Sequence, residues 1–251
     1  MLILGAMMPR WLTHITIAVI ASLGSSTSRA DLIVDSWLLG TGVSDSNSPG
    51  NPSESDATDI VQNPFNETLM AELNGSSSTA VHDFSWTADT GSFDIDVTHF
   101  LMELDGDTST SGRITVHPAV DSIIAFDAFF DYAWPSAAIG GSSLTFSVFD
   151  NNTQEGVLSA SDLGGNVGLG LPFGTLEVTA SALLQAGGEY EIVYTAGIRH
   201  FDPTPPGTHG DGTGNIHFTI TPVPEPATAS LLIAGLLLHR RASKSRRPRR
   251  R

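Results

Sequence analysis

The chain has 251 residues, contains no cysteine and carries a formal net charge of −15. The lack of cysteine excludes a disulfide framework and thiolate metal sites. Residues 31–224 hold 26 of the 27 acidic side chains but only two basic ones, Arg113 and Arg199, so this section has a net charge of −24. Such a surface repels nucleic acid and anionic lipid, and we expect no nucleic-acid partner for it.

The first 30 residues have the order of charge and hydrophobicity that is typical of a secretory signal peptide. Arg10 precedes an apolar stretch at 11–23, and a short polar stretch then ends in Ser-Arg-Ala at 28–30. Small side chains stand at both positions that signal peptidase inspects, so we expect cleavage after Ala30 and export of the rest. The alternative, an uncleaved anchor, is less well supported because polar residues interrupt the short apolar stretch.

Residues 31–221 show the period of two that is typical of half-buried strands. In the stretch 174–180, for example, apolar Leu176 and Val178 alternate with Glu177 and Thr179. The same pattern predicts strands at 32–38, 81–86, 93–104, 113–117, 122–132, 144–148, 174–180, 189–196 and 216–220. Because no helical apolar stripe interrupts them, we predict an all-β fold, a single antiparallel β-sandwich that is jelly-roll-like.

The strand pattern has three interruptions. Within 93–104, the apolar residues at 93, 95 and 97 have one parity and those at 100, 102 and 104 have the other. A β-bulge near Thr98 or His99 would restore a common face. Two stretches rich in proline, glycine and polar residues, 41–63 and 200–214, are predicted to be loops.

One calcium site is a candidate. The segment that starts at Asp105 and Asp107 begins like a calcium-binding loop, with oxygen donors at its first, third and fifth positions. Thr110 then replaces the required glycine and Val116 the bidentate glutamate, which excludes an EF-hand. A weaker calcium site at Asp105 and Asp107 and a plain turn between strands both stay open. Otherwise we expect no cofactor.

Catalytic motifs are absent from the sequence. The histidines do not form a His-Glu-x-x-His zinc motif, and there is no Gly-x-Ser-x-Gly nucleophile elbow. His200, His209 and Asp211 are expected to be exposed in one loop. We therefore predict no catalytic residues. The alternative is a secreted carbohydrate-active hydrolase with a carboxylate pair, which needs only two of the many acids.

Aromatic side chains could serve as stacking platforms for sugars. The candidates are Trp37, Trp86, Tyr132 and Trp134. Trp134, which precedes a proline, is expected to reach a loop edge, whereas the other tryptophans are expected to fill the core. Asp94 and Asp96 share one strand face, where they would either add oxygen ligands for a cation or simply be solvated.

The last 30 residues combine a rigid motif, an apolar run and a basic end. Val223-Pro224-Glu225-Pro226 comes first, and its prolines fix φ and lack an N–H, so it stays extended and accessible. The uncharged run that follows is expected to form a hydrophobic membrane helix that includes Ala227, Leu231, Leu232, Ile233, Leu236, Leu237 and Leu238. The basic tail is expected to stay at the cytoplasmic face, through Arg240, Arg241, Lys244, Arg246 and Arg247.

The apolar run is short for a membrane span. Twelve residues, 227–238, reach roughly 18 Å against a hydrocarbon core of about 30 Å. Bilayer thinning could close part of this gap. The alternatives are an interfacial helix held by the basic cluster and an arginine-rich tail that binds nucleic acid.

With this order of elements, residues 222–251 resemble the PEP-CTERM sorting signal of bacterial exoproteins. The resemblance implies export, a transient stay at the inner membrane and processing near Glu225 by exosortase, a membrane transpeptidase-like enzyme. Such proteins are often linked to exopolysaccharide or biofilm matrix. The sequence thus predicts a signal peptide at 1–30, a β-sandwich at 31–221 and a sorting signal at 222–251. The expected role is that of a non-catalytic cell-surface or extracellular-matrix protein, with exopolysaccharide or calcium as candidate ligands.

Overall fold

The computed structural model describes residues 32–45, 50–59, 62–88, 90–102, 106–134, 140–165, 173–200 and 209–224. The predicted signal peptide with Ala30, the calcium candidate Asp105 and the tail from Glu225 onward lie outside these residues. Within the described part of the chain, no helix has the length and apolar character needed to cross a membrane.

The described residues contain twelve strands, most of which alternate between inward and outward side chains. They are β1 (Ile33–Asp45), β2 (Ser53–Thr58), β3 (Phe65–Leu73), β4 (Ser76–Trp86), β5 (Gly91–Met102), β6 (Gly106–His117), β7 (Ser122–Ala133), β8 (Gly140–Asp150), β9 (Glu155–Gly165), β10 (Phe173–Leu184), β11 (Tyr190–His200) and β12 (His209–Pro222). Strand β2, in contrast to most, is exposed or half-buried along its length.

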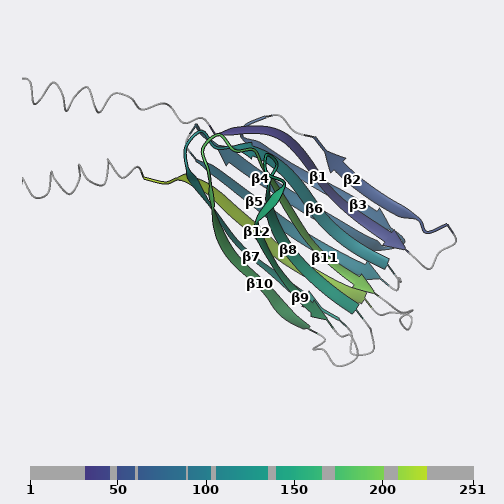
Figure 1. Ribbon diagram of the computed structural model, residues 1–251. Coiled ribbons are helices and arrows are strands. Elements are labelled where there is room, and N and C mark those ends of the chain that lie inside the picture. The colour runs from purple at the N-terminus through teal and green to yellow at the C-terminus, as the bar shows by residue number, and fades with distance from the viewer. Residues whose placement is uncertain are drawn as a thin grey trace, which may run out of the picture.

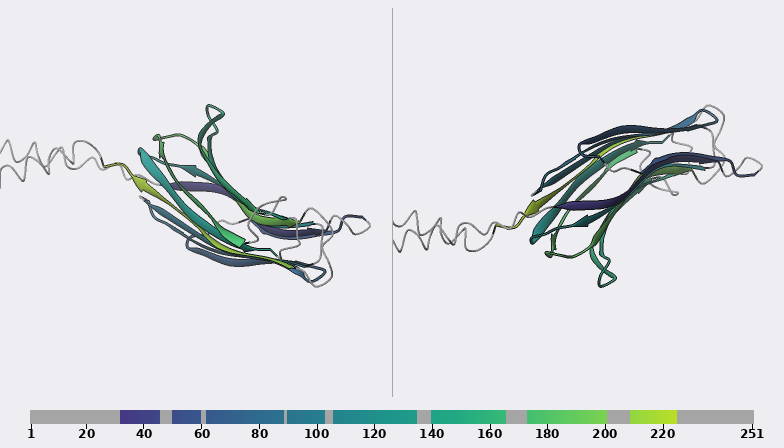
Figure 2. Two further views of the ribbon diagram at one scale, coloured as in Figure 1. Left: turned by 90° about the horizontal axis from the view of Figure 1, so that it is seen from below. Right: turned by 90° about the horizontal axis from the view of Figure 1, so that it is seen from above.

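The strands form two antiparallel sheets that pack face to face (Figure 1). Sheet A has the order β2-β1-β6-β11-β8-β9, and sheet B has the order β10-β7-β12-β5-β4-β3. The last eight strands alone give a jelly roll, because β6-β11-β8-β9 faces β5-β12-β7-β10 and most connections change sheet. The first four strands widen both sheets on one side. The predicted jelly-roll-like sandwich is therefore confirmed, and Figure 2 shows its two layers curving together.

Aromatic rings from both sheets fill the centre of the sandwich. Phe126 of sheet B stacks on Phe146 of sheet A with centroids 3.8 Å apart, and Phe93 stacks on Phe218 at 4.5 Å. All four side chains are at most 1% exposed. Such pairs add about 0.5–1.5 kcal/mol beyond the burial of their area, so this cluster holds the two sheets together.

Strand β5 contains no bulge, and that prediction was wrong. Its pairing with β12 and with β4 runs without a register shift. The change in apolar parity has another cause: His99 takes an inward position and is 1% exposed, while Met102 lies on the outer face at 38%. A buried polar residue in β5 thus produced an apolar pattern that resembles a change of register.

The two predicted loops are partly strands. The stretch 41–63 contains the end of β1 and all of β2, and β12 already begins at His209. Strands β3 and β9 were also missed. Strands β2, β3 and β9 lie at sheet edges, where one side is wet and the apolar pattern is weak.

Aspartates cover the open sides of the sandwich. On one side, Asp56 of β2 accepts a hydrogen bond from the backbone N–H of Met70 in β3, at 3.0 Å. On the other side, Asp162 of β9 accepts one from the N–H of Glu177 in β10, at 3.1 Å. Each carboxylate occupies an edge N–H that would otherwise be open to a further strand, and it also discourages edge-to-edge association through its charge.

Both ends of the described body lie at the same end of the sandwich (Figure 1). The N–H of Leu32 donates to the carbonyl of Ala88 at 2.7 Å, and the N–H of Val223 donates to that of Asp121 at 2.8 Å. We call this the tail end. Strands β1, β5, β7, β9 and β11 all end on the opposite side of the sandwich, which we call the loop end.

The central aromatic cluster is expected to dominate stability. Replacement F146A removes a fully buried ring and leaves a cavity, so the free energy of unfolding should fall by about 3–5 kcal/mol. The control F129A removes a ring that is 44% exposed, and it should cost about 1 kcal/mol or less. Urea denaturation of both variants measures this, and equal losses would contradict the described core.

Candidate functional site

The acidic candidates from the sequence lie on both outer faces. Asp94 and Asp96 are on the outer face of sheet B, as their shared parity indicated. Asp107 lies at the start of β6 in sheet A, paired in register with Ser44 and Arg199. Among the described residues, no group of three or more histidines, aspartates and glutamates is placed to hold a metal ion. The calcium site stays a prediction, because Asp105 is not described.

The aromatic candidates are mostly interior. Trp134 is only 5% exposed, and a Cβ added at Gly140 or Gly210 would collide with its ring, so the expected position at a loop edge was wrong. Tyr132 fills the space beside Gly164 of β9. Trp86 is half-buried and packs against the core. The side chain of Trp37 lies outside the described residues. Trp134 and Tyr132 thus offer no open stacking platform, and Trp86 borders a hollow in the outer surface of sheet B.

A serine and a histidine meet in the core. Ser78 Oγ and His99 Nδ1 are 2.9 Å apart, and Thr41 hydrogen-bonds to Ser78 and to Thr110. Both members of the Ser-His pair are at most 1% exposed. Burial lowers the pKa of His99 to about 4, which keeps the ring neutral. The pair therefore lies within sheet B, between β4 and β5, and does not face a cleft. The Thr41–Ser78 hydrogen bond connects it to sheet A.

The other histidines are at the surface or in the core. His209 lies on β12, and its Nε2 is 3.3 Å from Asp211 Oδ2. His217 Nδ1 is 2.6 Å from Asp94 Oδ1 on the neighbouring strand. His82 is fully buried, and burial lowers its pKa to about 4. The side chain of His200 is not described.

The two outer faces differ in charge. The six strands of sheet B contain no lysine or arginine, and their outward positions carry Glu72, Asp83, Asp94, Asp96, Asp127, Asp131, Glu177 and Asp211. Several of these carboxylates accept hydrogen bonds from a neighbouring strand, for example that of Asp96 from Asn215 at 2.9 Å. Sheet B therefore presents a strongly negative face.

The outer face of sheet A is made of small side chains. In register across the sheet stand Ser55, Gly42, Ser109, Gly197 and Ser143, followed one row away by Ala57, Gly40, Ser111, Thr195, Thr145 and Ser161. Arg113 and Arg199 also lie on this face. Arg113 Nε is 3.5 Å from Glu191 Oε1, and Arg199 is opposite Asp107. This face is close to neutral.

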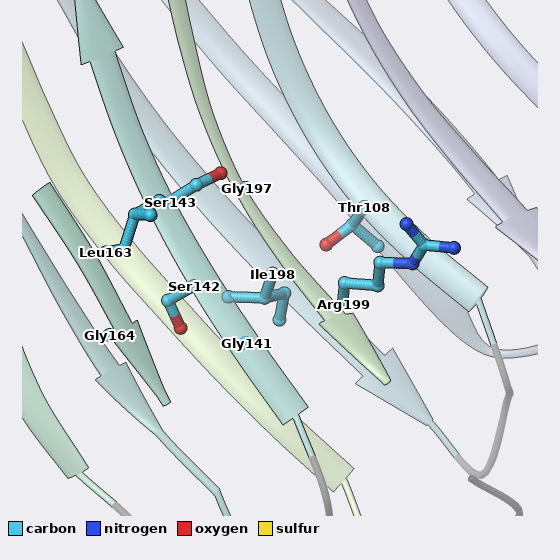
Figure 3. A pocket seen from close by; sticks show the side chains of 9 residues that line it. All are labelled: Thr108, Gly141, Ser142, Ser143, Leu163, Gly164, Gly197, Ile198 and Arg199. Carbon is cyan, nitrogen blue, oxygen red and sulfur yellow. The ribbon is translucent and has the colours of Figure 1, made fainter. Parts of the chain in front are cut away.

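A groove of about 330 Å³ crosses four strands of this face near the loop end. The residues that line it are Thr108, Gly141, Ser142, Ser143, Leu163, Gly164, Gly197, Ile198 and Arg199 (Figure 3). Five of them occupy outward positions. The others form the intervening row, in which Thr108, Ile198 and Ser142 turn their side chains inward, so the floor is largely backbone.

Glycine is what opens the groove. A Cβ at Gly197 would lie 2.7 Å from the carbonyl oxygen of Thr108, so this position accepts no larger residue. Leu163, which is 72% exposed, stands at one end, and Arg199 stands on the next row. The groove therefore offers apolar contact, the Ser143 hydroxyl and one guanidinium. No sequence motif marked it, because its residues come from four separate strands.

The comparisons with known proteins identify no family. No protein-family model matches the chain, and no curated protein matches it. Among solved structures, it is similar to an arabinose-bound α-L-arabinofuranosidase, MgGH51, with 10% identity and a TM-score of 0.22, covering 56% of this chain and 22% of the other.

Two further solved structures are similar. For the mosquito-larvicidal Cry4Aa toxin of Bacillus thuringiensis the identity is 10% and the TM-score 0.22, with 78% and 43% of the two chains covered. For carbohydrate-binding modules of the β-sandwich superfamily the identity is 12% and the TM-score 0.20, and the match covers 76% of this chain and 84% of the other. At these identities and TM-scores, the similarity does not identify a ligand or an activity for this chain.

The buried histidines are expected to make stability depend on pH. In the folded state the pKa values of His82 and His99 are lowered from 6.5 to about 4, so the unfolded chain binds more protons between these values. Their contribution is complete above pH 6.5 and is lost as the pH falls toward 4, by about 3 kcal/mol at most for each. Denaturant unfolding at several pH values should show a shallower loss for H99Q than for the wild type. The control H209Q, in an exposed position, should follow the wild type, and an unchanged slope in H99Q would contradict this assignment.

Proposed function

We propose that this protein is an exported, non-catalytic cell-surface or extracellular-matrix protein that is sorted by its C-terminal tail. One observation supports this most directly: the body ends at Val223 and Pro224, where the Val-Pro-Glu-Pro motif begins, at the same end as Leu32. A body with both ends on one side can stand on a membrane with its loop end pointing away. Signal peptidase, exosortase and transient contact with the inner membrane are the partners that this proposal requires.

The neutral groove is the proposed site for exopolysaccharide. A sugar ring has apolar C–H faces and a rim of hydroxyls. The backbone floor and Leu163 suit the faces, while Ser143 and Arg199 suit the hydroxyls or a carboxylate. The negative face of sheet B would repel acidic polymers, which directs them to sheet A. Calcium, the other candidate ligand, would be bound through Asp105 and Asp107 at the start of β6.

The alternative of a carboxylate-pair hydrolase gains no specific support. Such an enzyme needs two carboxyl groups about 5–9 Å apart beside a bound sugar. No carboxyl group lines the groove of sheet A or the hollow at the tail end of sheet B. The hollow at the β3–β4 turn is lined by one carboxyl group, that of Glu72. The aspartates of sheet B stand on an open strand face.

Processing is tested by mass spectrometry of the protein recovered from cells. The expected mature chain begins at Asp31 and ends near Glu225, because both boundaries lie just beyond the hydrogen-bonded residues of the body. Deletion of residues 240–251 serves as a comparison and should impair processing. A mature protein that retained Arg251 would overturn the proposed sorting.

Saccharide binding is tested by filling the groove. Replacement S143W places a large ring over the floor, and retention on polysaccharide isolated from the producing cells should weaken at least tenfold. The matched control T98W makes a similar change on the outer face of sheet B and should bind like the wild type. Melting temperatures of both variants control for folding. Equal retention of S143W and T98W would exclude the groove as the site.

A further inference from the structure

The last strand of the body runs directly into the sorting motif. Strand β12 lies in the interior of sheet B and stays paired with β5 up to Ile220, opposite Gly91, and with β7 up to its last residue, Pro222, opposite Ser122. The N–H of Val223 then donates to the carbonyl of Asp121 at 2.8 Å. Pro224 has no N–H to donate, so the hydrogen bonding stops there. The first residue of the motif is thus part of the folded body.

Hydrogen bonds fix the turns that surround the point where the chain leaves β12. Asp121 Oδ1 accepts a hydrogen bond from the N–H of Ala186 at 2.9 Å, and Gly187 donates to Pro118 at 2.8 Å. The turn between β4 and β5 is closed by Thr87, which donates to Thr90 at 2.7 Å. We call the surface that these turns form the end face. It consists of residues 87–88, Thr90, 118–121 and 185–188.

Distance along the chain limits how a processing enzyme can approach. An extended chain advances at most about 3.6 Å per residue, so Glu225 lies no more than about 7 Å beyond Val223. This is less than the diameter of one helix with its side chains, about 10–12 Å. An enzyme that encloses Pro224 and Glu225 in a cleft must therefore touch the end face.

We infer that the end face is the docking surface for the membrane-bound peptidase that processes the tail. This inference rests on the proposed function, since it presupposes processing at the motif. The enzyme recognises the motif together with the folded body, and Ala119 and Ala186, both exposed, lie within the contact. An unfolded body or a longer spacer would present the same motif without this surface.

The test combines a bulky residue with a spacer. Replacement A186W leaves the backbone N–H that binds Asp121 in place, and it should slow processing in cells at least tenfold. The matched control A133W puts tryptophan at the loop end and should leave the rate unchanged. A ten-residue glycine-serine spacer between Val223 and Pro224 should abolish the difference between A186W and its parent, because the enzyme then no longer meets the end face.

Crosslinking separates this inference from the proposed function. A photoreactive amino acid at position 119 or 186 should crosslink to the peptidase, whereas the same group at position 133 should not. If the wild-type tail is processed but positions 119 and 186 give no crosslink and A186W is processed normally, the docking surface is wrong and the sorting proposal stands. If the wild-type tail is retained in cells, the sorting proposal itself fails, and the inference falls with it.

Discussion

The strict alternation of side chains along paired strands is the constraint on which this structure depends. With few register shifts, each inward row continues across a six-stranded sheet, and so does each outward row. The rows that bury Phe126 and Phe218 therefore also fix which face carries the aspartates. A slip of one residue would exchange core and surface along a whole strand, so burial of the aromatic rings sets the charge pattern of the outside as well.

The same constraint forces polar residues inside, where the structure satisfies several of them. Parity places Thr41, Ser78, His99 and Thr110 between the sheets near the loop end, where they hydrogen-bond to one another. A buried polar group that loses its partner costs about 1–3 kcal/mol, so these contacts fix how β1, β4, β5 and β6 sit against each other. Burial of the aromatic cluster stabilises the contact between the sheets but does not depend on a specific geometry. The hydrogen bonds of the polar cluster do require a specific geometry.

Sequence pattern was sufficient for the fold because most strands are half-buried, and alternation such as that of Leu176 and Val178 is local. It failed where burial is not signalled by an apolar residue. His99 imitated a bulge, and the serine-rich strand β2 imitated a loop because it lies at an edge. The groove was out of reach for a different reason. Ser143 and Gly197 become neighbours only through the pairing of β8 with β11, which no local pattern encodes.

The negative charge of the body gives the stiffness at Val223 and Pro224 a second consequence. A basic tail that could fold back would meet the carboxylates on the outer face of sheet B, which lie along the strands behind the exit. The hydrogen bond of Val223 and the fixed φ of Pro224 instead restrain the chain at the end of β12. A flexible glycine-serine segment at the same place would permit the return. Rigidity at these two residues therefore opposes such a return where the chain leaves the body.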